Sequence, residues 1–206
     1  MPTHKSRTYF IVSVAILAAT SIIFDMIPLP RAPWGMKIDF VGTVWVLSYF
    51  LYGLPHALTV SAIATLYILL FSSTGYVGAI MKLIATAPMF LVPAAFAMVP
   101  SFSKRGLGLF RSPLVITAVA IVASVTRLLV ATVANLYWAI PIFFNMTPEQ
   151  ALAYFGGFIP LIVFVAGFNV VQGIVDMYVS WFIALKLRVA DRFGSRQSQT
   201  AMAGKQ

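Results

Sequence analysis

The sequence predicts an all-α integral membrane protein, a compact bundle of six transmembrane helices with both termini on the cytoplasmic side. Of its 206 residues, 61% are hydrophobic and only 9% are charged, and the mean hydropathy is +0.95. Water-soluble domains carry about 25% charged residues. The apolar residues gather in runs close to the roughly 20 residues that a helix needs to cross the hydrocarbon core of a bilayer. The chain length suits one such bundle and leaves no room for a separate soluble domain.

Six apolar segments are expected to span the membrane, divided by prolines and turn residues. They are Tyr9–Ile27, Ile38–Leu54, Pro55–Phe71, Tyr76–Val99, Pro113–Ile140 and Phe158–Leu187. Pro28, Pro30 and Pro33 end the first span, because proline cannot continue a helix. Gly53 lies in the turn between the second and third spans, and the polar stretch "SSTG" ends the third. The first apolar run is long for a signal peptide and lacks a clear cleavage site, so a retained span is expected rather than a cleaved signal.

The later spans contain prolines whose effect depends on position. Pro88 and Pro93 lie inside the fourth span, where neighbouring helices can satisfy the freed carbonyl groups. Pro141 is expected to end the fifth span before an external loop, and the polar hairpin "NMTPEQALAY" leads to the sixth. We expect one transmembrane domain over residues 1–192 and a basic, disordered cytoplasmic tail over residues 193–206.

The net charge of +9 follows the expected topology. Apart from two cations at membrane depth, only Arg31 and Lys37 fall on the side away from the termini. The cations on the side of the termini are Lys5, Arg7, Lys104, Arg105, Arg111, Lys186, Arg188, Arg192, Arg196 and Lys205. Lysine and arginine concentrate in cytoplasmic loops. We therefore expect a multi-pass protein of the cell membrane with cytoplasmic termini, and no nucleic-acid partner.

The sequence shows no pattern typical of catalysis. It contains no G-x-x-x-x-G-K-[ST] loop for ATP, no H-E-x-x-H metal motif and no G-x-S-x-G nucleophile motif. His4 and His56 are far apart and there is no cysteine, which excludes disulfides and thiolate metal sites. We expect a protein that is not an enzyme and that has neither metal nor cofactor. Energy for any transport must come from a partner or from an ion gradient.

Charged residues at membrane depth are candidates for function because they are costly to bury. Lys82 is expected at a depth similar to that of Asp25 and Asp39, and it can pair with either acid. Arg127 is expected to pair with Asp176 as a structural contact, because an unpaired charge in lipid is very unfavourable.

Two helical stripes of polar residues predict a ligand pocket that opens outward. The fifth span carries Arg127, Ala131, Asn135 and Trp138, and the sixth carries Asn169, Gln172, Asp176 and Ser180, at spacings of three or four residues. Amides suit a neutral, hydrogen-bonding ligand, and aromatic rings such as Tyr137 and Trp138 can stack on a flat one. The alternative is that the amides bond helix to helix and that the aromatic residues anchor the protein at the interface.

The chain resembles the substrate-binding S components of energy-coupling factor (ECF) vitamin transporters, most closely the riboflavin-specific type. The similar stretches are "AILAA" in the first span, "MKIDFVGTVWVLSYFLYG" in the second, "STGYVGAIMKLIATAPMFLVPAAF" around the fourth, "NLYWAIPIF" at the end of the fifth and "GFNVVQGI" in the sixth. The resemblance implies that the protein captures a vitamin from outside. A coupling subunit and two ATPase subunits then drive its release inward by toppling the S component in the membrane.

The resemblance also implies roles for individual residues. Asn135, Asn169 and Gln172 would bond the polar edge of an isoalloxazine ring, and Trp34 and Tyr76 would contact or cover the ligand. From the residues themselves we expect further substrate contacts from Asp39, Lys82, Tyr137 and Trp138. The small-residue face formed by Ala15, Ala18 and Ala19 would dock on the coupling subunit. The sequence departs from the family pattern at Lys82, which often is an amide there, and at Phe168, where a proline is frequent. A cation at position 82 would favour an anionic vitamin.

Two other classes of function remain open on the sequence. A solitary transporter would move its substrate without ATPase subunits. A membrane scaffold would use the amides only for packing and would bind no ligand saturably.

Overall fold

The structure is a computed structural model that describes residues 4–32, 35–103 and 106–191, and within these ranges it is helical. The α-helices are α1 (His4–Met26), α2 (Val41–Tyr52), α3 (Leu54–Phe71), α4 (Gly75–Thr86), α5 (Pro88–Met98), α6 (Pro100–Ser103), α7 (Pro113–Ala134), α8 (Ile140–Phe144), α9 (Pro148–Tyr154) and α10 (Phe158–Ile174). A 3₁₀ turn, η1 (Gly106–Arg111), precedes α7, and three π turns are η2 (Asn135–Ala139), η3 (Val175–Val179) and η4 (Phe182–Lys186). The expected tail at 193–206 lies outside the described residues.

The expected helical membrane bundle is confirmed. Within the described ranges, five helical stretches are long and apolar enough to cross a membrane, namely Arg7–Met26, Leu54–Phe71, Gly75–Met98, Pro113–Phe144 and Phe158–Lys186. The second expected span corresponds to the shorter apolar helix α2, of 12 residues. Large apolar side chains on the outer surface, such as Leu114 and Ile159 (80% and 72% exposed), suit a hydrocarbon solvent.

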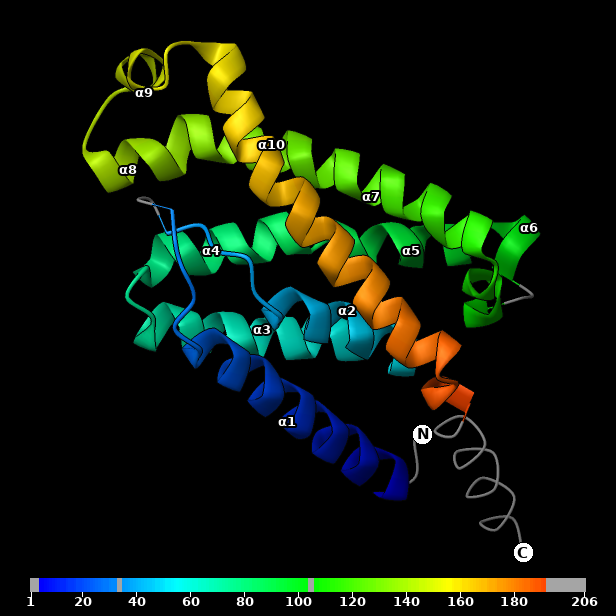
Figure 1. The fold of residues 1–206 in the computed structure, drawn as a ribbon. Coiled ribbons are helices and arrows are strands. Elements are labelled where there is room, and N and C mark those ends of the chain that lie inside the picture. Colours follow the sequence, from blue (N-terminus) through cyan, green and yellow to red (C-terminus); the bar gives the residue numbers. More distant parts are fainter. Residues whose placement is uncertain (1–3, 33–34, 104–105, 192–206) are drawn as a thin grey trace, which may run out of the picture.

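The start of α1 and the end of the last helix lie at one end of the bundle in Figure 1, together with α6. The connections after α1, α3 and α8 lie at the opposite end, which we call the loop end. Helix α10 crosses the bundle diagonally (Figure 1) and packs on α7. Which of the two ends faces the cytoplasm stays a prediction.

Helix α2 forms the centre of the bundle. Nine of its 12 residues are buried, and it packs against α1, α3, α5 and the two π turns of the last helix. Trp45, fully buried, donates its indole N–H to Ser21 Oγ at 2.9 Å and so ties α2 to α1. Phe50 is also fully buried and packs edge-on to Phe110 of η1. This apolar packing, about 0.8 kcal/mol for each buried CH₂ group, fixes the scaffold that carries the polar residues.

The expectation that Pro141 ends the fifth span is wrong. The helix continues through Pro141 to Phe144 and stops at Asn145, whose φ of 50° places it in the left-handed region. Proline costs a helix one hydrogen bond and crowds the carbonyl of the preceding turn. Here the preceding turn is the π turn η2, in which Ile140 N–H bonds to Asn135 O, five residues back. The wider turn accommodates the proline ring, and Pro141 lies in the first turn of α8, where it is tolerated.

Candidate functional site

A pocket of about 90 Å³ lies between α4, α7, α10 and the segment that joins α1 to α2. Its polar lining residues are Asp25, Arg31, Lys37, Ser72, Thr74, Lys82, Arg127, Asn135, Asn169 and Gln172. Typical ligand pockets enclose about 300–1,000 Å³. A volume of about 90 Å³ is large enough for only a few water molecules, so a vitamin requires the pocket to widen.

A short hairpin covers this pocket at the loop end. Arg31 and Lys37 pair as an antiparallel bridge, and Ala32 N–H donates to Met36 O at 2.7 Å. We call the described residues of this segment, Arg31, Ala32 and 35–37, the covering hairpin. Gly35 has a φ of 90°, and a Cβ on it would lie 2.8 Å from Thr74 Cγ2. Glycine therefore lets the hairpin pack closely on the turn between α3 and α4.

Asn135 is the predicted site residue whose bonding is incomplete. Its side chain is fully buried and lines the pocket. The Nδ2 group donates to Ala131 O in the preceding turn at 2.7 Å, whereas Oδ1 has no partner among the described residues. A buried acceptor without a donor costs about 1–3 kcal/mol. Asn135 Oδ1 is thus available to accept a hydrogen bond from a ligand.

The Arg127–Asp176 pair expected from the sequence is present. Arg127 Nη1 lies 2.9 Å from Asp176 Oδ2, and both side chains are buried. Asn169 supports the pair, because its Oδ1 accepts from Arg127 Nε at 3.0 Å and its Nδ2 donates to Val165 O at 2.9 Å. Thr43 also donates to Asp176 Oδ1. The Asn169 amide therefore orients the guanidinium as the structure stands.

Gln172 connects the last helix to the start of α2. Its Nε2 donates to Asp39 O and to Asp176 Oδ1, both at 2.7 Å, and its Oε1 accepts the Asp39 N–H at 2.9 Å. Both amide hydrogens of Gln172 are therefore in use.

Lys82 pairs with Asp39, one of the two acids expected for it. Its Nζ lies 2.5 Å and 2.6 Å from the two carboxylate oxygens. Asp25 pairs with Lys37 instead, at 2.8 Å, and Lys37 also lies 3.6 Å from Asp39. The buried carboxylate of Asp39 is thus flanked by two cations, and it also accepts the Val41 N–H at 3.0 Å.

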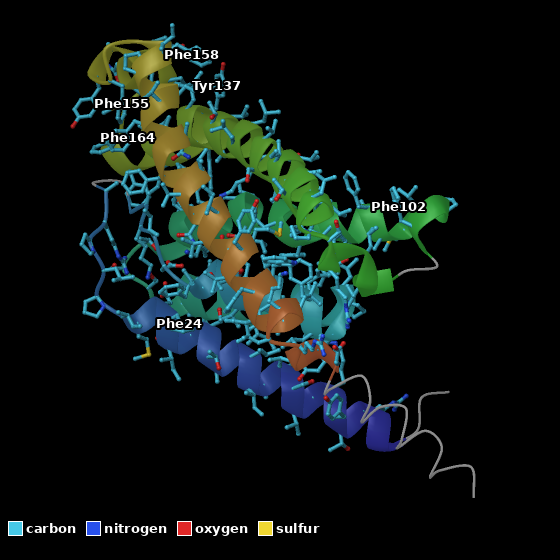
Figure 2. The ribbon with its side chains drawn as sticks, turned by 45° about the vertical axis from the view of Figure 1, so that its right-hand side comes forward. Phe24, Phe102, Tyr137, Phe155, Phe158 and Phe164 are labelled. Atoms are coloured by element: carbon cyan, nitrogen blue, oxygen red, sulfur yellow. The ribbon has the colours of Figure 1, made fainter. Side chains whose placement is uncertain are left out.

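The predicted aromatic residues that the structure describes do not line the pocket; they are Tyr76, Tyr137 and Trp138. Tyr137 is 66% exposed, and its side chain projects outward in Figure 2. Successive helix positions lie about 100° apart, so Tyr137 and Asn135 occupy different faces. Trp138 packs edge-on to the half-exposed Tyr76 at 6.4 Å between ring centroids. Trp34 lies outside the described residues.

Phe143 and Phe168 supply the aromatic lining, and the sequence reasoning missed both roles. Phe143 follows Asn135 and Ala139 at intervals of four, which is the spacing of one helical face. The spacing would have predicted that Phe143 lines the pocket if the helix had been expected to continue beyond Pro141.

The three alanines of α1 that were expected to form one face differ in exposure. Ala15 and Ala19 are exposed among Ile11, Val12 and Ile16, whereas Ala18 is 3% exposed and faces the bundle. The burial of Ala18 does not favour a direct contact with a partner, because Ala18 and its neighbour Ala19 lie about 100° apart around the helix axis. The partner interface on this face stays a prediction.

Among solved structures, that of the S component of a bacterial ECF transporter is similar to this chain. The TM-score is 0.67 with 22% sequence identity, and the match covers 90% of this chain and 97% of the other. The chain has the fold of an ECF S component. No protein-family model and no curated protein matches it.

Proposed function

We propose that this chain is the substrate-binding S component of an ECF-type importer. In this role it captures riboflavin from the outside, and a coupling subunit with two ATPase subunits energises uptake. The observation that carries the proposal is the position of the pocket: it lies beneath the covering hairpin, in a fold shared with an S component over 90% of the chain. The chain itself offers no ATP-binding loop.

The charges around the pocket support a neutral vitamin. Asp25, Asp39 and Asp176 are paired with Lys37, Lys82 and Arg127 in that order. The cation of Lys82, which on the sequence favoured an anionic ligand, is thus neutralised by Asp39. The unpartnered Asn135 Oδ1 suits the N–H of a ring imide, and Phe143 and Phe168 offer apolar surface for a flat ring. Riboflavin combines these features.

One observation favours a second candidate, an anionic vitamin or flavin phosphate. Arg31 lines the pocket and donates to Ser73 Oγ at 2.9 Å, but it has no acidic partner among the described residues. A ligand with a carboxylate or phosphate at its outer end would meet this guanidinium.

Visible absorption and flavin fluorescence of the detergent-purified protein test the proposal. We expect a yellow protein, or a colourless one that quenches the fluorescence of added riboflavin with saturation. If flavin mononucleotide competes more strongly than riboflavin, the Arg31 candidate replaces the neutral one. A colourless protein that quenches neither flavin would contradict the assignment to flavins.

Uptake by cells separates an S component from the alternatives. We expect riboflavin uptake when the chain is expressed with a coupling subunit and ATPases, and none when it is expressed alone. Uptake by the chain alone would identify a solitary transporter, and a protein without saturable binding of any vitamin would be a scaffold.

A further inference from the structure

Gln172 makes an unusual contact: one side-chain amide pairs with both backbone groups of a single distant residue. Its Oε1 accepts from Asp39 N–H and its Nε2 donates to Asp39 O, in the way a neighbouring strand would. The two residues are 133 positions apart. Because Asp39 lies before the first turn of α2, its N–H is outside the helical hydrogen-bond ladder and depends on this partner.

Asp39 lies two residues after the end of the covering hairpin, at the point where the hairpin joins the start of α2; we call this point the base of the hairpin. Its carboxylate is held by Lys82 and accepts the Val41 N–H at 3.0 Å, while its backbone is held by Gln172. Two residues earlier, Lys37 ends the hairpin and binds both the carboxylate and the backbone carbonyl of Asp25. The position of Asp39 therefore sets how the hairpin approaches the pocket.

The amide of Gln172 has little capacity left for a ligand. Both of its N–H groups donate, to Asp39 and to Asp176, and its oxygen already accepts one bond. Asn135, by contrast, has a free acceptor in the same pocket.

We propose that Gln172 is a positioning residue that fixes the base of the covering hairpin to α10, and that a bound ligand escapes faster when this contact is removed. The part of this inference that concerns the ligand rests on the proposed function, whereas the part that concerns the Asp39 backbone does not.

Hydrogen–deuterium exchange at single-residue resolution tests the backbone part without ligand. In the wild-type protein we expect slow exchange at the Asp39 amide, although it precedes α2. In Gln172→Met, which keeps the side-chain length but removes both polar groups, exchange at this amide should be roughly tenfold faster, as expected for one lost hydrogen bond.

Thr43→Val is the matched control. It removes a different donor to Asp176, the Thr43 hydroxyl, and leaves the Asp39 backbone contacts in place. We expect unchanged exchange at Asp39 in this variant. Equal acceleration in both variants would show that the Asp176 network as a whole, and not Gln172, holds the segment, and would overturn the proposal.

Stopped-flow fluorescence with riboflavin tests the ligand part. In Gln172→Met the dissociation rate should rise roughly tenfold with an unchanged association rate, because the lost contact closes the site rather than guiding entry. Unchanged dissociation would overturn this part. If the wild-type protein does not bind riboflavin, the proposed function fails, and the exchange experiment still decides whether Gln172 holds Asp39.

If Gln172→Met does not fold, Gln172→Asn provides the same test, since its amide is one methylene too short to reach both backbone groups. Rapid exchange of the Asp39 amide in the wild-type protein would overturn the proposal without any variant.

Discussion

Lys82 of α4 binds both carboxylate oxygens of Asp39, the residue that precedes Phe40 at the start of α2. The Asp39 side chain is fully buried and that of Lys82 is 15% exposed. The pair therefore joins α4 to the start of α2 in a region from which water is largely excluded. Removing either charge leaves the other buried without this partner.

Replacing Lys82 with methionine should destabilise the protein, because Asp39 is left as a buried carboxylate. Breaking a buried pair costs about 3–5 kcal/mol, and we expect the lower end because Lys37 lies 3.6 Å from Asp39. Thermal unfolding in detergent measures the loss. The double variant Lys82→Met with Asp39→Asn should recover much of it, and a double variant less stable than Lys82→Met would contradict the pairing.

Asn135→Leu should weaken riboflavin binding far more than it weakens the fold. The variant removes an acceptor that has no partner among the described residues, so affinity should fall about 10- to 100-fold while the free energy of unfolding changes by less than about 1 kcal/mol. Fluorescence titration and thermal unfolding measure the two effects. Thr126→Val is the control, since that hydroxyl donates to Val122 O of its own helix and Thr126 does not line the pocket. Equal affinities for Asn135→Leu and wild type would remove Asn135 from the site.

Gly42→Ala should destabilise the buried ion pair. A Cβ at this position would lie 2.6 Å from Asp176 Oδ2, which is closer than real contacts allow. Forcing an extra carbon into a packed interior costs about 1–3 kcal/mol, which thermal unfolding can detect. Gly167→Ala is the matched control within α10, because a Cβ there meets nothing within 4 Å. It should be neutral or stabilising by up to about 1 kcal/mol, and a loss equal to that of Gly42→Ala would point to a general effect of replacing helical glycine.

Replacing Ala15 and Ala19 together with tryptophan should abolish ATP-dependent uptake and leave riboflavin binding intact. Both residues are exposed on α1, so added bulk blocks the approach of another helix without entering the bundle. Uptake by cells and binding by the purified protein measure the two properties. Leu114→Trp, on the exposed surface of α7, should keep both. Loss of binding in the double alanine variant would contradict a docking role for this face.

The sequence predicts the helices well because their signals are local. Long apolar runs, and the prolines after Met26, mark where helices lie and where α1 ends. The Arg127–Asp176 contact was also predictable, since two lone charges at similar depth have few other partners. Pro141 was misread because a π turn that absorbs a proline leaves no clear mark in the sequence.

The role of Gln172 could not be predicted, for a different reason. Its partner is the backbone of Asp39, 133 residues away, and every residue carries the same backbone groups. No residue type or spacing identifies such a contact. The outward position of Tyr137 and the inward position of Ala18 likewise depend on the rotation of each helix about its axis, which packing decides.

Helix α2 is only 12 residues long, or about 18 Å at 1.5 Å per residue, against about 30 Å of hydrocarbon. The non-helical backbone before α2 therefore enters the depth of the bilayer, where it is tolerated because protein groups such as the Gln172 amide satisfy it. The hydrophobic mismatch of this short helix is taken up by surrounding protein and not by thinning of the lipid. Membranes of different thickness would then act on the outer helices and leave α2 and the backbone before it unchanged.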